Sequence, residues 1–284
     1  MDFKSGKWAK KLIEMQLDDG SWGYFHTLNK DSVLSITTEQ ALRRLEILGF
    51  TSDDKPIKNV LKYMHNILSG KISFPDREEK FKNWKIGRDF MLATWIRIFT
   101  EKDNIANEIA QKWAEIINAA FIHKKYDYNI YKESYIKTFG INTIHENISI
   151  FYLVSIISNL LDKNIEKYYF KYILENNSGI YYIYDNKLLI VPESFNIKNI
   201  NGYIRAIELL AKYNNLECKK QLNFIVKWLN SNKLKDNMWD LGKNAKDGIN
   251  FPLSDSWKTE ENRIKDCTYR INKLLETIVI SFHK

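Results

Sequence analysis

The sequence predicts an all-α protein, an α/α toroid of five or six helical hairpins in a single domain that spans residues 1–284. Three observations predict this fold. Helical signals run through most of the chain, which contains only four prolines and 11 glycines. Helix ends followed by an aromatic residue recur at a spacing of about 50 to 60 residues, which is typical of helical-hairpin repeats. The first and last predicted helices lack an outer neighbour, so each can complete the other and close a ring.

Capping signals place the individual helices. Thr37 and Gln40 form a capping box ahead of a segment with apolar residues at helical spacing. Gly49 is placed where a glycine with a left-handed backbone would end this helix. Asp53 or Asp54 can cap the next helix, whose first turn contains a proline and which ends at a glycine. Thr143 and Glu146 suggest a second capping box ahead of a helix over 144–160. The other predicted helices are 4–17, 87–101, 104–122, 163–176, 199–213, 216–231 and 259–281.

One segment departs from the helical pattern. Residues 179–192 read GIYYIYDNKLLIVP, an alternation rich in β-branched and aromatic side chains. Asp185 and Asn186 lie in its middle and are typical turn residues. We therefore expect a small β-hairpin inserted among the helices near 179–192.

Composition and charge restrict the class of protein. Hydrophobic residues make up 44% of the chain and charged residues 27%, which is ordinary for a globular protein. The net charge is +8, but the lysines are spread along the chain and form no long basic run. Cys218 and Cys267 show no paired spacing, which favours reduced thiols and the cytoplasm. The longest apolar stretch, 148–161, is too short to cross a bilayer, so no transmembrane segment is predicted.

A repeat is visible in the turns. Each of five helix ends carries a Gly, Asn or Asp turn that an aromatic residue follows closely, and the markers are Gly20, Gly70, Asp127, Gly179 and Asn237. The clearest copy reads QLDDGSWGYF, residues 16–25. Gly20 permits a tight turn, the Gln16 amide can satisfy helix-end backbone groups, and Asp19 can cap the following segment. We interpret this acidic stretch as structural and not catalytic.

The sequence QLDDGSWGYF, followed by TTEQALRRLEILGF, resembles the repeat of the squalene and hopene cyclase and protein-prenyltransferase superfamily. NMWDLG, residues 237–242, is a fainter second copy. The resemblance implies an α/α toroid with a central cavity. It does not carry over the family's chemistry, because the chain lacks a D-x-D-D acid motif, a D-D-x-x-D magnesium motif and a zinc ligand set. No metal and no cofactor is therefore expected.

Two clusters are candidate sites. The first lies in the polar, aromatic segment 239–271, where carboxylates and an arginine fork could face an anionic ligand. Its candidate acids are Asp240, Asp255 and Asp266, and its candidate ligand-binding residues are Trp239, Trp257, Arg263 and Arg270. A plain salt-bridge ladder on a packed loop is the alternative.

The second cluster lies in 74–95, where Trp84, Arg88 and Asp89 surround a helix start. Ordinary ion pairing is the alternative there. Tyr181 and Tyr182 could line an aromatic pocket, or could belong to the core.

These features favour a protein that binds or transforms an apolar, isoprenoid-like or natural-product-like small molecule in an aromatic cavity. If it is an enzyme, we expect a cyclase, lyase or transferase in which a carboxylate with a raised pKa donates the proton. An anionic small molecule is a second candidate ligand. The main alternative is a non-catalytic helical-repeat scaffold for a protein or peptide, and nucleic acid is the least favoured partner.

Overall fold

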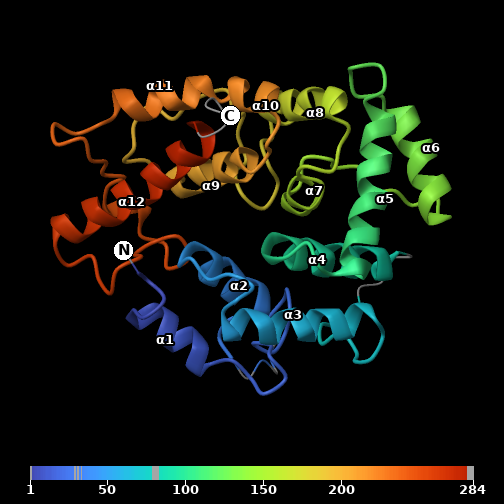
Figure 1. Ribbon diagram of the computed structural model, residues 1–284, viewed down its shortest axis with the longest axis horizontal. Helices are drawn as coiled ribbons and strands as arrows, with labels where there is room; N and C mark the ends of the chain where they lie inside the picture. Colours follow the sequence, from blue (N-terminus) through green and yellow to red (C-terminus); the bar gives the residue numbers. More distant parts are fainter. Residues whose placement is uncertain (1, 29, 31, 33, 79–82, 280–284) are drawn as a thin grey trace. The chain divides into compact units, whose positions relative to one another are not determined.

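The computed structural model describes residues 2–28, 30, 32, 34–78 and 83–279. The described residues are helical, with no strand longer than an isolated bridge, so the predicted all-α class is confirmed. Figure 1 follows the helices along the chain. Their bounds are α1 Lys7–Glu14, α2 Thr38–Ile47, α3 Lys55–Leu68, α4 Trp84–Phe99, α5 Asn104–Ala120, α6 Tyr128–Phe139, α7 Phe151–Ile156, α8 Lys163–Glu175, α9 Ile200–Ala211, α10 Leu216–Gln221, α11 Asn223–Ser231 and α12 Glu260–Val279, with a 3-10 turn at Lys243–Ala245.

The chain forms two compact units. The first contains Met1–Ala110 and Lys246–Lys258, and the second contains Gln111–Ala245 and Thr259–Lys284. In the first unit α1 packs against α2, and α3 packs against α4. In the second unit α8 packs against α10, and α9 packs against both α7 and α12 (Figure 1). Each unit has its own apolar core, which includes Trp22 and Trp95 in the first and Tyr169 and Trp239 in the second.

The predicted capping box of α2 is confirmed. The Thr37 hydroxyl accepts a hydrogen bond from the Gln40 backbone, and the Gln40 side chain accepts one from the Thr37 backbone. Gly49 and Gly70 follow α2 and α3 with left-handed backbone angles, φ 91° and 74°. Local capping chemistry therefore sets these helix ends as the sequence indicates.

The segment 16–25 has the structural role that the sequence predicts. The Gln16 side-chain amide donates to the carbonyl oxygens of Gly20, at 2.9 Å, and Pro56, at 2.8 Å. The Asp19 carboxylate accepts the backbone N–H of Ser21 at 2.8 Å. Trp22 is fully buried, and its indole N–H donates to the carbonyl of Leu12 at 2.8 Å.

The same arrangement recurs in the second unit, 217 residues later along the chain. Trp239 donates its indole N–H to the carbonyl of Leu229 at 2.8 Å, again ten residues earlier. Its backbone N–H donates to the Thr268 hydroxyl at 2.9 Å, as that of Trp22 donates to the Thr38 hydroxyl at 2.9 Å. NMWDLG is therefore a structural copy of the DGSWGY turn.

The preceding turns also match. The backbone N–H of Leu17 donates to the carbonyl of Ser21, and that of Leu234 donates to the carbonyl of Met238. Four of the five turn markers, Gly20, Gly70, Gly179 and Asn237, have positive φ angles. The fifth, Asp127, is instead the N-cap of α6, and its side chain accepts the backbone N–H groups of Asn129 and Ile130.

The second predicted capping box is wrong. Residues 144–148 are not helical, and α7 is confined to Phe151–Ile156. Tertiary hydrogen bonds hold the segment extended. The Tyr131 hydroxyl donates to the carbonyl of His145, the Tyr169 hydroxyl donates to that of Ile148, and the Ser149 hydroxyl donates to that of Gly179.

The sequence also missed α6, which Asp127 caps at one end and Gly140 ends at φ 69°. The predicted helix 216–231 is two helices that meet at Leu222. The predicted helix 259–281 corresponds to α12, and the end expected at 280–281 lies outside the described residues.

The segment 179–192 does not form two paired strands. It contains one antiparallel bridge, Ile180 to Tyr184, which closes a tight turn, and Tyr181 makes a further bridge to Ile150. Gly179 has a φ of 58°, and a Cβ there would lie 2.2 Å from the carbonyl oxygen of Tyr184. The segment therefore folds back on itself at once, which leaves no length for paired strands.

Candidate functional site

A histidine and a buried glutamate form the centre of the candidate site in the first unit. Glu39 is the second residue of α2, and only 4% of its surface is exposed. The Nδ1 atom of His26 lies 2.6 Å from the Glu39 Oε2 atom. A carboxylate that holds one imidazole nitrogen fixes the orientation of the ring and stabilises its protonated form.

The second oxygen of Glu39 is also held. Arg43, one turn further along α2, donates to Oε1 at 2.9 Å, and the Trp95 indole N–H of α4 donates to it at 3.1 Å. The Arg43 guanidinium lies 5.8 Å from the Trp95 ring centre, within the range of a cation–π contact. Glu39 therefore lies among three donors, which is how a buried carboxylate is normally stabilised.

Asp76 fixes the backbone at His26. Its carboxylate accepts the backbone N–H groups of Phe25, His26 and Thr27 at 2.5, 2.8 and 2.9 Å. The Phe25 ring packs against Phe74 at 5.6 Å between ring centres. The loop that carries His26 is thus held by charge and by aromatic packing, so the imidazole has a defined position.

The pKa values of the pair are moved apart. Burial alone would raise the pKa of Glu39, but the hydrogen bond from His26 and the charge of Arg43 outweigh it and lower that pKa to about 2. The hydrogen bond to Glu39 raises the pKa of His26 above 6.5, although burial opposes the rise. At neutral pH Glu39 is therefore ionised, and His26 is the member of the pair that can exchange a proton.

Neither His26 nor Glu39 was among the site residues that the sequence predicted. The two are 13 residues apart and match no known motif spacing. The available signal was weak: Glu39 stands inside the capping box, where an acidic residue ordinarily serves the helix dipole at the surface. Only the contact with Trp95, 56 residues later in the chain, shows that this carboxylate is buried and shared.

The predicted cluster in 74–95 lies partly beside this pair. Trp84 packs on Phe74 at 5.9 Å between ring centres, and Phe74 in turn contacts Phe25. Arg88 and Asp89 pair with each other at 2.7 Å on α4, and Lys85 also binds Asp89. These two charges form a local ion-pair group and do not contact Glu39 through any hydrogen bond between described residues. Residues 79–82 of the predicted cluster lie outside the described part of the chain.

The predicted cluster in 239–271 is divided between the units. In the second unit Arg263 binds Asp240 in a two-pronged contact, with both hydrogen bonds at 2.7 Å. Burial alone would raise the pKa of Asp240, but the hydrogen bonds from Arg263 lower it below its usual value. Asp240 is therefore an ion-pair partner rather than an acid that holds a proton at neutral pH.

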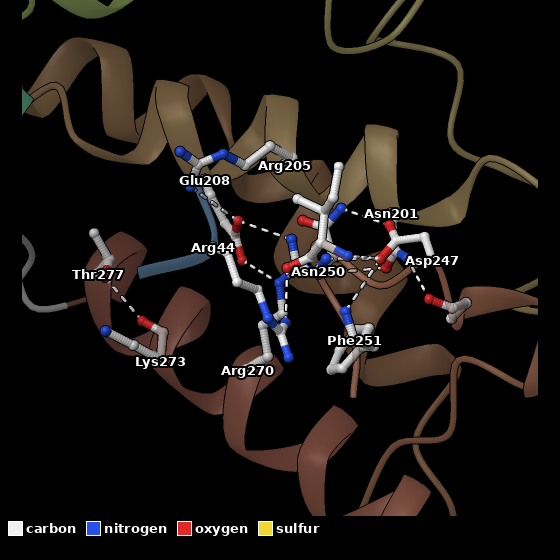
Figure 2. Close-up of polar contacts among 12 residues, drawn as sticks. Arg44, Asn201, Arg205, Glu208, Asp247, Asn250, Phe251, Arg270, Lys273 and Thr277 are labelled. Carbon is white, nitrogen blue, oxygen red and sulfur yellow. Dashed lines mark hydrogen bonds and ion pairs between the residues drawn. The ribbon is translucent and has the colours of Figure 1, made fainter. Parts of the chain in front are cut away.

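Arg270 and Asp266 lie buried on α12 of the same unit. Arg270 donates to both carboxylate oxygens of Glu208 on α9, at 2.7 and 3.0 Å, and to the Asn201 side chain at 3.3 Å (Figure 2). Arg270 is thus committed to joining α12 with α9. Trp239, predicted to bind ligand, is 2% exposed and serves the turn described above.

Asp255 and Trp257 belong to the first unit. The Asp255 carboxylate accepts the backbone N–H of Lys7 at 2.7 Å, at the start of α1. Trp257 packs on Phe251 at 4.9 Å between ring centres. Asp255 is exposed, so its position is that of a helix cap at the surface.

Tyr181 and Tyr182 are exposed rather than enclosed. Their ring centres are 4.2 Å apart, and 49% and 46% of their surfaces are accessible. Tyr182 has a φ of 74°, a strained angle for a residue with a bulky side chain. The pair therefore lies on the surface of the second unit.

Within the described part of the chain, no group of three or more His, Cys, Asp and Glu side chains is arranged to hold a metal ion. Cys218 and Cys267 are both buried and are free thiols. None of the described helices is both long and apolar enough to span a membrane. Comparisons with protein-family models, curated proteins and solved structures found no match.

Proposed function

We propose that this chain is a helical-repeat protein of the terpenoid cyclase and prenyltransferase type. On this proposal, five or six helical hairpins close into an α/α toroid in one domain. The repeated indole-to-carbonyl contact of Trp22 and Trp239 supports the proposal. Two copies of one turn at opposite ends of a chain are typical of a repeat architecture.

The proposed ligand is an apolar, isoprenoid-like small molecule, and the proposed chemistry is proton transfer. The observation that carries the chemistry is the 2.6 Å contact between His26 and the buried Glu39. Glu39 orients the imidazole and stabilises its protonated form, while the Trp95 indole donates to the second carboxylate oxygen. His26 then gives or takes the proton, and the carboxylate remains ionised.

This assignment changes the proton donor from the one that the sequence suggested. Asp240 is held ionised by Arg263, so it does not suit the role of an acid. Asp255 and Asp266 stay predictions as alternative carboxylates. An imidazole with a raised pKa is better matched to proton exchange near neutral pH than the exposed carboxylate of Asp255 is.

One observation favours the scaffold alternative. Four large apolar side chains within ten residues of the second unit are at least 40% exposed, namely Tyr181, Tyr182, Leu189 and Ile190. Exposed apolar groups in one segment are typical of protein contacts. The free buried thiols agree with the proposed cytoplasmic location, where either function could operate.

The first experiment tests the ligand class. The full chain is titrated with farnesol and with geranylgeraniol, and binding is monitored by tryptophan fluorescence. Binding should saturate with a Kd of about 1 μM, which corresponds to a binding free energy of about −8 kcal/mol. Mass spectrometry of solvent extracts from the purified protein should detect a bound apolar molecule. Saturation by neither alcohol, together with an empty extract, would contradict the proposal and favour the scaffold.

The second experiment tests the role of His26. Incubation of the protein with the bound alcohol or the extracted ligand should yield a product whose rate falls at least about 100-fold in His26→Gln. Wild-type activity should depend on one ionisation above pH 6.5, since the pKa of His26 is raised. The matched control is His123→Gln, an exposed histidine outside the site. An equal loss in both variants, or no loss in His26→Gln, would remove His26 from the mechanism.

A further inference from the structure

A second candidate site lies in the second unit, where the segments 194–196 and 240–244 and helix α12 surround a depression of 590 Å³. Its lining combines polar side chains with one aromatic ring and consists of Ser194, Phe195, Asn196, Asp240, Gly242, Lys243, Asn244 and Arg263. The space is several times larger than a single water molecule, so a small organic molecule can enter it. The polar groups of this lining determine which ligand it would suit.

The two-pronged ion pair of Arg263 and Asp240 forms the rigid side of the depression. Asp240 Oδ1 also accepts the backbone N–H of Gly242 at 2.8 Å, so both of its oxygens are engaged. The Arg263 side chain is only 8% exposed, and its Nε and Nη2 atoms bind Asp240, with Nη2 also binding Glu260. The Nη1 atom meets no acceptor among the described residues.

Three more donors line the same depression without an acceptor among the described residues. They are the Lys243 ammonium, the Ser194 hydroxyl and the amide nitrogen of Asn196, whose oxygen is already bound by Asn244 at 3.3 Å. Asn196 is also held in place by packing. A Cβ on Gly242, which has a φ of 77°, would lie 2.4 Å from the Asn196 Oδ1 atom. The Asn196 side chain therefore rests directly on the glycine backbone.

We propose that this depression binds a small molecule through an oxyanion group, a carboxylate or a phosphate, held by Arg263, Lys243, Asn196 and Ser194. Four residues with donor groups line one space while its only carboxylate is engaged, so the matching ligand group is rich in acceptors and negatively charged. Two cationic side chains against one anionic side chain give the lining a net positive charge. The proposal is independent of proton transfer by His26, because all of these residues belong to the second unit.

Binding of two simple probes tests the proposal with the full chain. Isothermal titration with inorganic phosphate and with malonate, at constant ionic strength, should give one saturable site for at least one probe below about 10 mM. Saturation by malonate alone identifies a carboxylate ligand, and saturation by phosphate alone identifies a phosphate ligand. If neither probe saturates, the proposal is overturned.

Two charge-matched variants locate the site. Lys243→Gln should weaken binding of the saturating probe about tenfold, because a charge-assisted hydrogen bond is lost. Lys235→Gln removes the same charge from an exposed position outside the depression and should change binding less than about twofold. Equal weakening in both variants would mean unspecific attraction to a basic protein and would overturn the site.

A third variant tests the position of the oxyanion directly, independently of the charge of Lys243. Asn196→Asp preserves the shape of the side chain and places a carboxylate among the donors, so it should abolish saturable binding. Its urea unfolding midpoint should stay close to that of the wild type, which shows that lost binding is not lost folding. Unchanged probe affinity in Asn196→Asp would contradict the proposed position of the oxyanion.

Discussion

The indole N–H of Trp22 donates a 2.8 Å hydrogen bond to the carbonyl oxygen of Leu12, the residue ten positions earlier. Trp239 and Leu229 repeat this contact with the same separation and the same length. The carbonyl lies in each case near the end of a helix, where backbone oxygens have lost their helical partners. A buried tryptophan thus closes a helix end and anchors the following turn in both units.

Loss of either indole N–H should destabilise the protein. Trp22→Phe and Trp239→Phe each remove the donor and some ring volume, and each leaves a buried carbonyl without that partner, at a cost of at least about 2 kcal/mol. Urea denaturation measures the change in unfolding free energy. Trp84→Phe is the control, because its half-buried indole makes no hydrogen bond with described residues, and its cost should stay under about 1 kcal/mol. Equal costs in all three would refute the special role of the contact.

Glycine at position 20 is required by both backbone angle and space. Its φ is 92°, and a Cβ would lie 2.6 Å from the Asn59 carbonyl oxygen. Gly23 has a similar φ of 83°, but a Cβ there meets nothing within 4 Å. Gly23→Ala should therefore cost only the left-handed backbone penalty of about 1–2 kcal/mol, whereas Gly20→Ala adds the clash.

Thermal and urea unfolding of the two variants separate these contributions. Gly20→Ala should be less stable than Gly23→Ala by at least about 1 kcal/mol, since the atom in the way belongs to the backbone of α3 and cannot move aside cheaply. Equal urea midpoints for the two variants would show that a Cβ at position 20 does not clash with the backbone of α3.

Local signals predicted much of the fold because capping and turn chemistry act within a few residues. The capping box at Thr37 and the left-handed glycine at position 49 form as their spacing indicates. The error at 144–148 has the opposite cause. There the Tyr131 and Tyr169 hydroxyls, from other helices, bind the backbone carbonyls and override the local capping signal.

The candidate site was harder to predict for the same reason. Glu39 has the appearance of an ordinary first-turn acid, and its burial depends on Trp95, 56 residues later. His26 is placed by Asp76, 50 residues away. No local pattern encodes such contacts. By contrast, the pair of Asp240 and Arg263 was within a segment whose density of charged and aromatic residues did indicate a structured loop.

The pair of His26 and Glu39 should make stability depend on pH in a predictable way. The pKa of Glu39 falls from 4.5 to about 2 on folding, so its contribution is complete above pH 4.5 and is lost as the pH falls toward 2. The pKa of His26 rises above 6.5, so its contribution is present below pH 6.5 and is lost as the pH rises through the raised value. Both contributions are present together between about pH 4.5 and 6.5.

Glu39→Gln should therefore be most destabilising in that window, by up to about 3 kcal/mol. Urea denaturation at about pH 3, 5.5 and 8.5 should show the largest difference from the wild type at the middle value. The control Glu108→Gln changes an exposed glutamate and should give a small difference that does not vary with pH. NMR titration of His26 should show its pKa fall in Glu39→Gln, and an unchanged value would contradict the pairing.

The last prediction concerns Arg270 and Glu208, which join α12 to α9 in the second unit through two hydrogen bonds (Figure 2). Arg270 is 5% exposed, so removal of either partner leaves a charge in a largely buried place. Arg270→Met and Glu208→Leu should each cost about 3–5 kcal/mol. The double variant Arg270→Met with Glu208→Leu should cost less than the sum of the two single changes, because each single change leaves one charge of the pair without the other. Arg205, whose guanidinium lies 3.7 Å from Glu208, loses that ion pair in every variant that lacks the carboxylate. Urea denaturation of the four proteins gives the coupling free energy. A double variant at least as unstable as the sum of the single changes would show that the two side chains do not act as a pair.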